Sequence, residues 1–295
     1  MEQIQQSQQP LSHAEVRPKS QSWLIMLDIL FYLLLIAFLA GFVLYLYSNR
    51  DIITIDFPVL LQGAGATIVI SLISAVLATI FGFIGALGRL SRFAVFRGIA
   101  AVYVEVIRGT PILVQLFLWG FGISAVLNNI GFDPHTIAFQ FMTVLQSNSF
   151  VPSEFAFNAS FYGILGLSFN YGAYLTEVFR TGIESVPQGQ TEAGLSLGLA
   201  SSHILRSIVL PQAIRITIPP FANYFITLVQ DSALLSTLGG VIELQQLTTS
   251  LASPLSSEPN KQLFVYILGA LLFLAICYPL ALLARYLEAR MSVAY

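Results

Sequence analysis

The stretch TEAGLSLGLASSHILRSIVLPQAIR, from Thr191 to Arg215, is polar and rich in serine, although the chain around it is strongly apolar. It follows Val186-Pro187-Gln188-Gly189-Gln190, a turn-like run that ends an apolar segment. We expect Thr191 to cap a short helix, with Glu192 favourably placed near its positive end. Gly198 is expected to bend the chain after this helix.

A second short helix is expected after the bend, because Ser201 or Ser202 can cap it and Leu210-Pro211 can end it. Two such helices at a membrane surface can either lie on the lipid as interfacial helices or dock into a groove of a partner protein. The partner is favoured, because helices that rest on lipid prefer Trp, Phe and Lys, whereas this strip is small and apolar: Ala193, Leu197, Ala200 and Ile204.

The composition indicates a membrane protein. Of the 295 residues, 56% are hydrophobic and 9% are charged, whereas soluble domains are roughly 25% charged. The net charge of -2 gives no field that would attract nucleic acid. The single cysteine, Cys277, lies in an apolar run, which excludes an internal disulfide and any cysteine-based metal site.

Six apolar runs are long enough to cross a membrane as helices, since about 20 residues at about 1.5 Å each span the hydrocarbon core. The runs are continuous rather than alternating, which favours helices over barrel strands. The first run is too long for the apolar part of a signal peptide. We therefore predict an all-α, polytopic membrane bundle with spans at about Trp23–Tyr47, Leu61–Leu87, Ile99–Leu127, Phe161–Ile183, Pro220–Leu238 and Leu263–Leu287.

The basic residues indicate the orientation, because cytoplasmic loops carry an excess of Lys and Arg. If the N-terminus is cytoplasmic, ten basic residues fall on that side, and only Arg50 and Lys261 fall outside. Both termini and the Thr191–Arg215 stretch are then expected in the cytoplasm, with the loops 128–160 and 239–262 outside.

The expected domain organisation follows from these spans. Residues 1–22 form a polar cytoplasmic tail, 23–58 an additional N-terminal transmembrane helix with an external loop, and 59–290 the main membrane domain. The main domain contains the short-helix loop at 186–215, and 291–295 form a C-terminal tail. The sequence contains no soluble domain or internal repeat.

Patterns for catalysis or nucleotide binding are missing from the sequence. A phosphate-binding loop needs a lysine after a glycine-rich turn, and the only two lysines, Lys19 and Lys261, follow none. No H-E-x-x-H pattern occurs, and the three histidines lie on different loops. We expect no enzymatic activity, bound metal or cofactor in this chain.

Ionisable residues inside the apolar runs mark candidate sites. Each costs about 2.5–3.5 kcal/mol to insert and usually faces a bundle interior or a water-filled path. Glu105 and Arg108 lie three residues apart on one face of the third run, where a purely structural ion pair is the alternative. The fourth run carries a polar stripe, in which Arg180 can pair locally with Glu177. The stripe either lines a path for a polar solute or bonds to neighbouring helices: Asn170, Tyr174, Glu177, Thr181 and Glu184.

The fifth run is expected to start at Pro219-Pro220, which suit a helix start and break whatever precedes them. Polar residues follow on adjoining faces: Asn223, Thr227, Gln230 and Asp231. A path for a zwitterion needs an anion for the ammonium group and donors for the carboxylate. The candidates are Glu177 or Asp231 for the first need, and Arg108, Gln115 or Asn223 for the second.

The opening stretch resembles a known family. Its pattern, E-A-x-x-x-x-G, nine residues, then I-x-L-P, is similar to the EAA loop in the membrane subunits of bacterial ATP-binding cassette (ABC) importers. Glycine stands at Gly194, where the family usually has alanine. The resemblance assigns coupling to the ATPase to Gly189, Glu192, Ala193, Gly194, Gly198, Leu210 and Pro211.

Longer stretches narrow the resemblance to the polar amino acid branch of these importers. They are YVEVIRGTPILVQLFLWGFG at 103–122, NYGAYLTEVFRTGIESVPQGQTEAGLSLG at 170–198, LPQAIRITIPPFANYFITLVQDSALLSTLG at 210–239 and YPLALLARYLEAR at 278–290. The resemblance covers about Leu60 to Arg290. Gln230 stands where the family commonly has a lysine, so Asp231 lacks a cation next to it in sequence.

The resemblance implies a permease subunit of the bacterial inner membrane. Two such subunits, identical or different, would pair around a translocation path. Two cytoplasmic subunits that bind ATP and Mg would dock on the EAA loops, and an external or periplasmic binding protein would deliver the amino acid. The short helices would then transmit motion and carry no catalytic role.

A secondary amino acid transporter driven by an ion gradient is the alternative function. It predicts ion-coupling carboxylates and often inverted repeats, and no repeat is found. A membrane-bound enzyme or scaffold is a further alternative, which the lack of a catalytic pattern disfavours. The sequence leaves the identity of the transported amino acid open.

Overall fold

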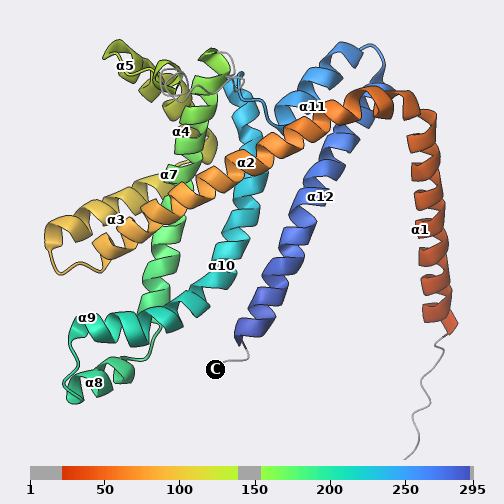
Figure 1. Ribbon diagram of the computed structural model, residues 1–295. Helices are drawn as coiled ribbons and strands as arrows, with labels where there is room; N and C mark the ends of the chain where they lie inside the picture. Colours follow the sequence, from red (N-terminus) through yellow and green to blue (C-terminus); the bar gives the residue numbers. More distant parts are fainter. Residues whose placement is uncertain (1–21, 139–153, 293–295) are drawn as a thin grey trace, which may run out of the picture. The chain divides into compact units, whose positions relative to one another are not determined.

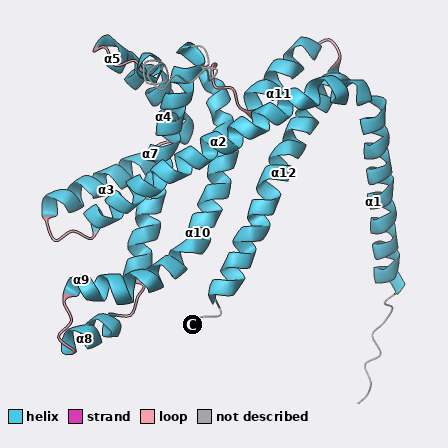
Figure 2. Cartoon of the chain, viewed as in Figure 1, coloured by secondary structure: helices cyan, strands magenta, loops and turns pink. Residues whose placement is uncertain are grey.

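The computed structural model describes residues 22–138 and 154–292, in which the regular structure is entirely helical (Figures 1 and 2). This confirms the all-α prediction for these residues. The first range contains α1 (Ser22–Ser48), α2 (Arg50–Arg89), α3 (Ala94–Arg108), α4 (Ile112–Phe117), the π-helical turn η1 (Leu118–Ile123) and α5 (Ser124–Asn129). The second contains α7 (Glu154–Glu184), α8 (Gln188–Ser196), α9 (Ser201–Ile204), the π-helical turn η2 (Leu205–Val209), α10 (Leu210–Asp231), the 3-10 helix η3 (Ser232–Leu238), α11 (Leu244–Ala252), the 3-10 turn η4 (Ser253–Leu255) and α12 (Pro259–Ser292).

Four segments of the described chain are long and apolar enough to cross a membrane: Leu27–Ser48, Arg50–Arg89, Ile112–Asn129 and Pro259–Met291. They correspond to the first, second and sixth predicted spans and to part of the third. The fourth and fifth predicted runs lie in α7 and α10. The total of six spans stays a prediction. The predicted N-terminal tail lies outside the described residues, as do residues 139–153 of the first external loop and the last three residues of the C-terminal tail.

The chain divides into two compact units after Arg50. The first unit contains α1, and none of the described side chains in its apolar segment Leu27–Ser48 is buried. The second unit contains the rest of the described chain. The external loop predicted before residue 59 is wrong, because α2 is helical from Arg50 onwards. A helix is possible there because Pro58 removes only one backbone hydrogen bond.

Helix α7 is the centre of the second unit. It packs against α10, α3 and α4, while α10 also packs along α12 and α12 along α11. One core joins α7 to α4, α10 and η3, and it includes Leu167, Tyr171, Leu175, Leu116, Leu228 and Leu235. Because α7 packs against so many of the other helices, each of the sites described below contains residues of α7 or follows directly after it.

Glycines let α2 approach α7 closely. A Cβ on Gly82 would lie 2.6 Å from the Cβ of Leu175, and one on Gly85 would overlap the Thr176 side chain. Small residues permit such contacts between helix backbones. The close approach places the end of α2 beside the charged part of α7.

The third predicted span, Ile99–Leu127, is wrong as a single helix. Helix α3 ends at Arg108 and α4 begins at Ile112, with Gly109-Thr110-Pro111 between them. Proline disfavours the helical conformation in the residue before it, and Pro111 is itself extended, with φ -61° and ψ 137°. Arg108 therefore lies at a helix end and not inside a span.

The predicted breaks at the other prolines are also wrong. Helical structure runs without interruption from Ser201 through η2 to Asp231, so Leu210-Pro211 ends no helix and Pro219-Pro220 lie inside α10. A π-helical turn, Leu205–Val209, directly precedes Leu210-Pro211, and such a turn adjusts the helix locally where the proline lacks a backbone N–H. Such local adjustments and packing against neighbours allow prolines inside membrane helices, and α10 packs on both α7 and α12.

Glu243 starts α11 outside the predicted spans. Its carboxylate accepts the backbone N–H groups of Gln245 and Gln246, each at 2.6 Å, and its side chain is fully buried. Burial raises the pKa of this carboxyl group to about 7 despite the two hydrogen bonds. The backbone N–H of the next residue, Leu244, donates to the Thr67 hydroxyl of α2 at 3.1 Å, which fixes α11 on that helix.

Candidate functional site

The loop after α7 contains two short helices, as predicted. They begin earlier than expected: Pro187 precedes α8 and Ala200 precedes α9, so Thr191, Ser201 and Ser202 lie inside helices and cap neither. The reason is that the fixed backbone of Pro187 prepares a helix start one turn before Thr191. Glu192 is exposed in the middle of α8, and Gly189 is exposed in its first turn.

Gly198 makes the predicted bend through a left-handed backbone, with φ +75°. The Leu199 N–H donates to the Gly194 carbonyl at 3.1 Å, and the Gly198 N–H donates to the Leu195 carbonyl at 2.9 Å. These two bonds form a Schellman motif that ends α8. A Cβ on Gly198 would meet no atom within 4 Å, so the backbone angle alone requires glycine here.

Gly194 is the buried contact of α8. A Cβ at this position would lie 2.8 Å from Ile204 Cγ1. Ile204 belongs to a small core with Val186, Val209 and Ala213, which holds the loop against the start of α10. Leu210 and Pro211 form the first turn of that helix.

The predicted apolar strip on this loop is wrong, because the bend at Gly198 separates its members. Ile204 is buried, whereas Ala193, Leu197 and Ala200 are exposed. Leu195 and Leu197 are 52% and 79% exposed and form an apolar surface on α8 and the turn after it. Leu195 and Leu197 are therefore available for contact with a partner, whereas Ile204 is part of the core of the loop.

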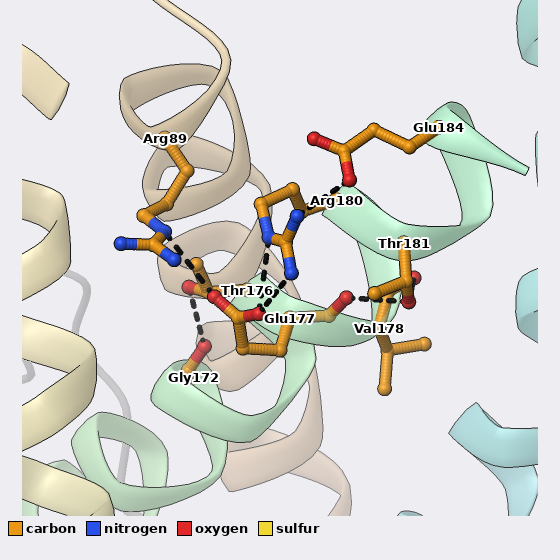
Figure 3. A network of polar contacts seen from close by, with 8 residues as sticks. All are labelled: Arg89, Gly172, Thr176, Glu177, Val178, Arg180, Thr181 and Glu184. Atoms are coloured by element: carbon orange, nitrogen blue, oxygen red, sulfur yellow. Dashed lines mark hydrogen bonds and ion pairs between the residues drawn. The ribbon is translucent and has the colours of Figure 1, made fainter.

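A charged cluster lies at the end of α7 that leads to this loop (Figure 3). The Glu177 carboxylate is 2.7 Å from Arg180 Nη2 and 3.3 Å from Arg89 Nε, and Arg180 also pairs with Glu184. Figure 3 shows Arg89 reaching across from α2, while the other three belong to α7. The local pair predicted between Glu177 and Arg180 is confirmed.

A cavity of about 500 Å³ lies where α7 and α10 meet the break between α3 and α4. Its wall includes four of the eight residues predicted for a solute path: Arg108, Asn170, Thr227 and Asp231. Tyr174, which belongs to the predicted polar stripe of the fourth run, also lines it, together with Tyr171 and Tyr224, which were not predicted. Of the remaining predicted residues, Glu177 belongs to the charged cluster, Asn223 and Gln230 are exposed on α10, and Gln115 is buried behind the wall.

The cavity holds a cation and an anion on different elements. The Arg108 guanidinium carbon is 5.4 Å from the centre of the Tyr174 ring, which is itself 5.4 Å from the Tyr224 ring. The Tyr171 hydroxyl donates to Asp231 Oδ2 at 2.6 Å. Within residues 22–138 and 154–292, Arg108 forms no ion pair with Glu105 or Asp231, so the structural pair considered for Glu105 and Arg108 is not observed.

Gln115 supports the cavity wall from behind. Its Nε2 lies 2.7 Å from the Ile107 carbonyl, 3.1 Å from the Thr110 carbonyl and 2.8 Å from the Thr110 hydroxyl. The two carbonyls lie where α3 ends and lack regular helical partners, and the Gln115 amide donates to them. Its Oε1 accepts the side-chain N–H of Asn170 at 3.0 Å, which fixes the amide of Asn170 at the cavity wall.

The spacing of residues on α10 contains a signal for the missed tyrosine. Thr227 and Asp231 follow Tyr224 by three and seven residues, which places all three on one helix face. The prediction followed the neighbouring face of Asn223, Thr227 and Gln230 instead. Among the described residues, no three His, Cys, Asp or Glu side chains lie close enough to hold a metal ion.

Comparison with known proteins decides the family. A family model described as "Binding-protein-dependent transport system inner membrane component" matches residues 78–293. The chain belongs to this family. The probable amino-acid ABC transporter permease protein YckA of Bacillus subtilis is 33% identical to this permease over 244 residues, which cover 83% of the permease and 93% of YckA. The L-cystine transport system permease protein TcyB of the same organism is 33% identical over 235 residues, covering 80% of the permease and 87% of TcyB.

Structural comparison agrees with this membership. The permease resembles a chain in the crystal structure of an amino acid ABC transporter with histidines, with a TM-score of 0.62 and 28% identity. The match covers 79% of the permease and 94% of that chain. The protein is thus a multi-pass inner-membrane permease of the polar amino acid branch, and the ATPase of such a transport system is a separate component.

Proposed function

We propose that this permease carries an amino acid past the cavity between α7 and α10, where Arg108 binds the carboxylate and Asp231 binds the ammonium group. The observation that carries this proposal is the presence of both charges in one cavity wall without an ion pair between them. A zwitterion needs this arrangement, because each of its charges loses water on entering the membrane. Asn170 and the tyrosine hydroxyls add polar contacts for the same ligand.

The names of the relatives support an amino acid as the cargo. TcyB is named for L-cystine, and the similar transporter structure contains histidines. Three tyrosines give the cavity wall aromatic surface, which suits side chains of several kinds. The proposal therefore covers the amino acid class and no single member of it.

The proposed path needs a second permease subunit, identical or different. Thr227 lines the cavity, whereas Asn223 and Gln230 are exposed beside it on α10. In our proposal these two residues face the space between the paired subunits. The chain crosses the membrane six times with both termini in the cytoplasm. Residues 59–290 form the permease core, and residues 23–58 before it contain the extra helix α1 and the first turns of α2. Residues 1–22 and 291–295 are the cytoplasmic tails.

Energy for transport would enter at the loop 186–215. Two cytoplasmic subunits that bind ATP and Mg would dock there, and an external or periplasmic binding protein would deliver the amino acid on the other side. The exposed surface of α8, with Glu192, Ala193 and Gly189, would form the contact. Gly198 sets its turn, Gly194 packs it on Ile204, and Leu210 and Pro211 begin α10, the helix that the loop leads into. We assign Glu177 to the contact between α7 and α2 rather than to the cargo, because Arg89 and Arg180 already neutralise it.

Uptake by the assembled complex in proteoliposomes tests the cargo site. Hydrogen bonds to a charged group contribute about 1.5–3 kcal/mol, so Arg108→Gln or Asp231→Asn should raise the KM for the amino acid by roughly 10- to 100-fold. Arg285→Gln is the matched control, because Arg285 is exposed on α12 and away from the cavity lining. Unchanged kinetics in both cavity variants would reject the site. Uptake that persists without the ATPase and follows an ion gradient would instead support the secondary transporter.

A further inference from the structure

A second cavity, of about 530 Å³, lies between α2, α3 and α7, and it shares no residue with the proposed cargo cavity. Its walls are apolar side chains such as Leu87 of α2, Phe96 and Ile99 of α3, and Phe169 of α7. We call it the apolar groove. The proposed transport of a zwitterion does not use this groove, so any ligand that fills it is a different one.

The interior of the apolar groove offers little to a polar ligand. Tyr103 and Ser91 carry the only hydroxyl groups among the residues that line it. The Tyr103 hydroxyl already donates to the Phe169 carbonyl at 2.7 Å, and the Ser91 hydroxyl accepts the Phe93 N–H at 3.1 Å. The groove therefore suits a hydrocarbon chain.

One end of the groove is basic. Ser91 lines the groove in the turn between α2 and α3, and its carbonyl accepts a hydrogen bond from Arg97 at 3.4 Å. The guanidinium of Arg92 lies 4.9 Å from the centre of the Phe93 ring in the same turn. Both arginines are exposed, and neither forms an ion pair within the described residues. The sequence from 57 to 104 contains no acidic residue that could neutralise them.

We infer that the apolar groove binds an acyl chain of an anionic phospholipid, whose phosphate is held by Arg92 and Arg97. The combination of an apolar groove with two unpaired arginines at one end matches the two parts of such a lipid. Basic pockets between membrane helices on the cytoplasmic side are known to suit anionic headgroups. Phe96 and Tyr103 are seven residues apart on α3, so the groove follows the helix for about 10 Å, a depth that a lipid tail exceeds.

Quenching of tryptophan fluorescence by brominated lipids tests this inference in the full-length permease. Trp23→Phe and Trp119→Phe remove both native tryptophans. In this background, Phe96→Trp places a reporter on the groove wall. Val102→Trp places the control reporter on α3 at a position that is 63% exposed and does not line the groove.

The vesicles contain phosphatidylcholine with a fixed minority of phosphatidylglycerol, and only one of the two lipids is brominated. Each arginine near an anionic headgroup gives about a fivefold preference, so two arginines give up to roughly 25-fold for phosphatidylglycerol at residue 96. At residue 102 the two lipids should quench in proportion to their amounts. Arg92→Gln with Arg97→Gln should reduce the preference at residue 96 to the level of residue 102, and the two Lys replacements should retain it.

Two results would overturn the inference. Equal quenching by both lipids at residue 96 would show that the arginines select no headgroup. Absence of quenching by either lipid at residue 96, with normal quenching at residue 102, would show that protein fills the groove, as a second permease subunit would. The Lys variants separate loss of charge from failure to fold, because they keep the charge at both positions.

Discussion

Replacing Gly198 with alanine tests the coupling loop through a single backbone angle. Gly198 has φ +75°, and a Cβ there would meet no atom within 4 Å. The substitution therefore adds no steric overlap with neighbours. Its cost is the roughly 1–2 kcal/mol that an L residue needs to adopt the left-handed conformation. This lowers the equilibrium constant for forming the observed turn by about 5- to 30-fold.

The affinity of the ATPase subunits for the permease in detergent measures this effect, together with stimulated ATP hydrolysis by the assembled complex. We expect Gly198→Ala to raise the Kd by up to about 30-fold, because only the molecules with the observed turn present α8 correctly. Gly65→Ala is the matched control. Gly65 is also an exposed glycine with no atom near its Cβ position, but it lies inside α2, outside the loop 186–215, where alanine favours the helix by about 1 kcal/mol.

The reasoning fails if Gly198→Ala binds the ATPase with wild-type affinity and supports normal hydrolysis. It also fails if Gly65→Ala weakens binding to the same extent, since the left-handed angle would then not be the cause. Membrane insertion of both variants, followed by extraction and gel filtration, shows that the measured change concerns the loop and not the fold.

Three further predictions concern stability in detergent. Glu243 is fully buried, and burial raises its pKa from 4.5 to about 7, so the folded chain keeps a proton that the unfolded chain releases. The free energy of unfolding should therefore fall by about 3 kcal/mol as the pH rises from 4.5 to 7, and Glu243→Gln should abolish this dependence in chemical unfolding. Gly182→Ala should destabilise the chain by about 1–3 kcal/mol, because the new Cβ overlaps the Thr217 methyl group, and Thr217→Ser should restore the thermal midpoint if that overlap is the cause. A double-mutant cycle of Arg89→Gln and Glu177→Gln should give a coupling energy of about 1 kcal/mol, and additive changes in unfolding would show that the contact between α2 and α7 is not stabilising.

The sequence predicts the helical class well, because long continuous apolar runs leave few alternatives. It predicts the breaks poorly. Gly109-Thr110-Pro111 separates α3 from α4 in a stretch that is apolar on both sides. The apolar composition predicts one continuous helix there, and only Pro111 indicates the break. Pro219-Pro220 also predict a helix break, but α10 continues through them, because it is packed against α7 and α12. The effect of a proline thus depends on tertiary contacts, which the sequence alone does not contain.

The candidate site shows the same division. Arg108, Asn170, Thr227 and Asp231 were predicted because polar residues in apolar runs are conspicuous. Tyr171 and Tyr224 were missed because an aromatic residue in an apolar helix looks the same whether it faces a core or a cavity. Only the packing of α7 against α10 distinguishes the two cases. The pairing of Glu177 with Arg89 was likewise hidden, since these residues are on different helices.

Helix α7 joins the proposed cargo cavity to the proposed ATPase contact. Asn170 and Tyr174 line the cavity, Glu177 to Glu184 form the charged cluster, and α8 begins only four residues after α7 ends. From Asn170 to Glu184 the helix covers about 21 Å without a break. A helix that is continuous and packed on both sides moves as a rigid element, so a displacement of α8 would shift the cavity wall directly. The contact of Arg89 with Glu177 adds α2 to the same moving part, and the glycines of α2 keep the two helices close enough for that contact.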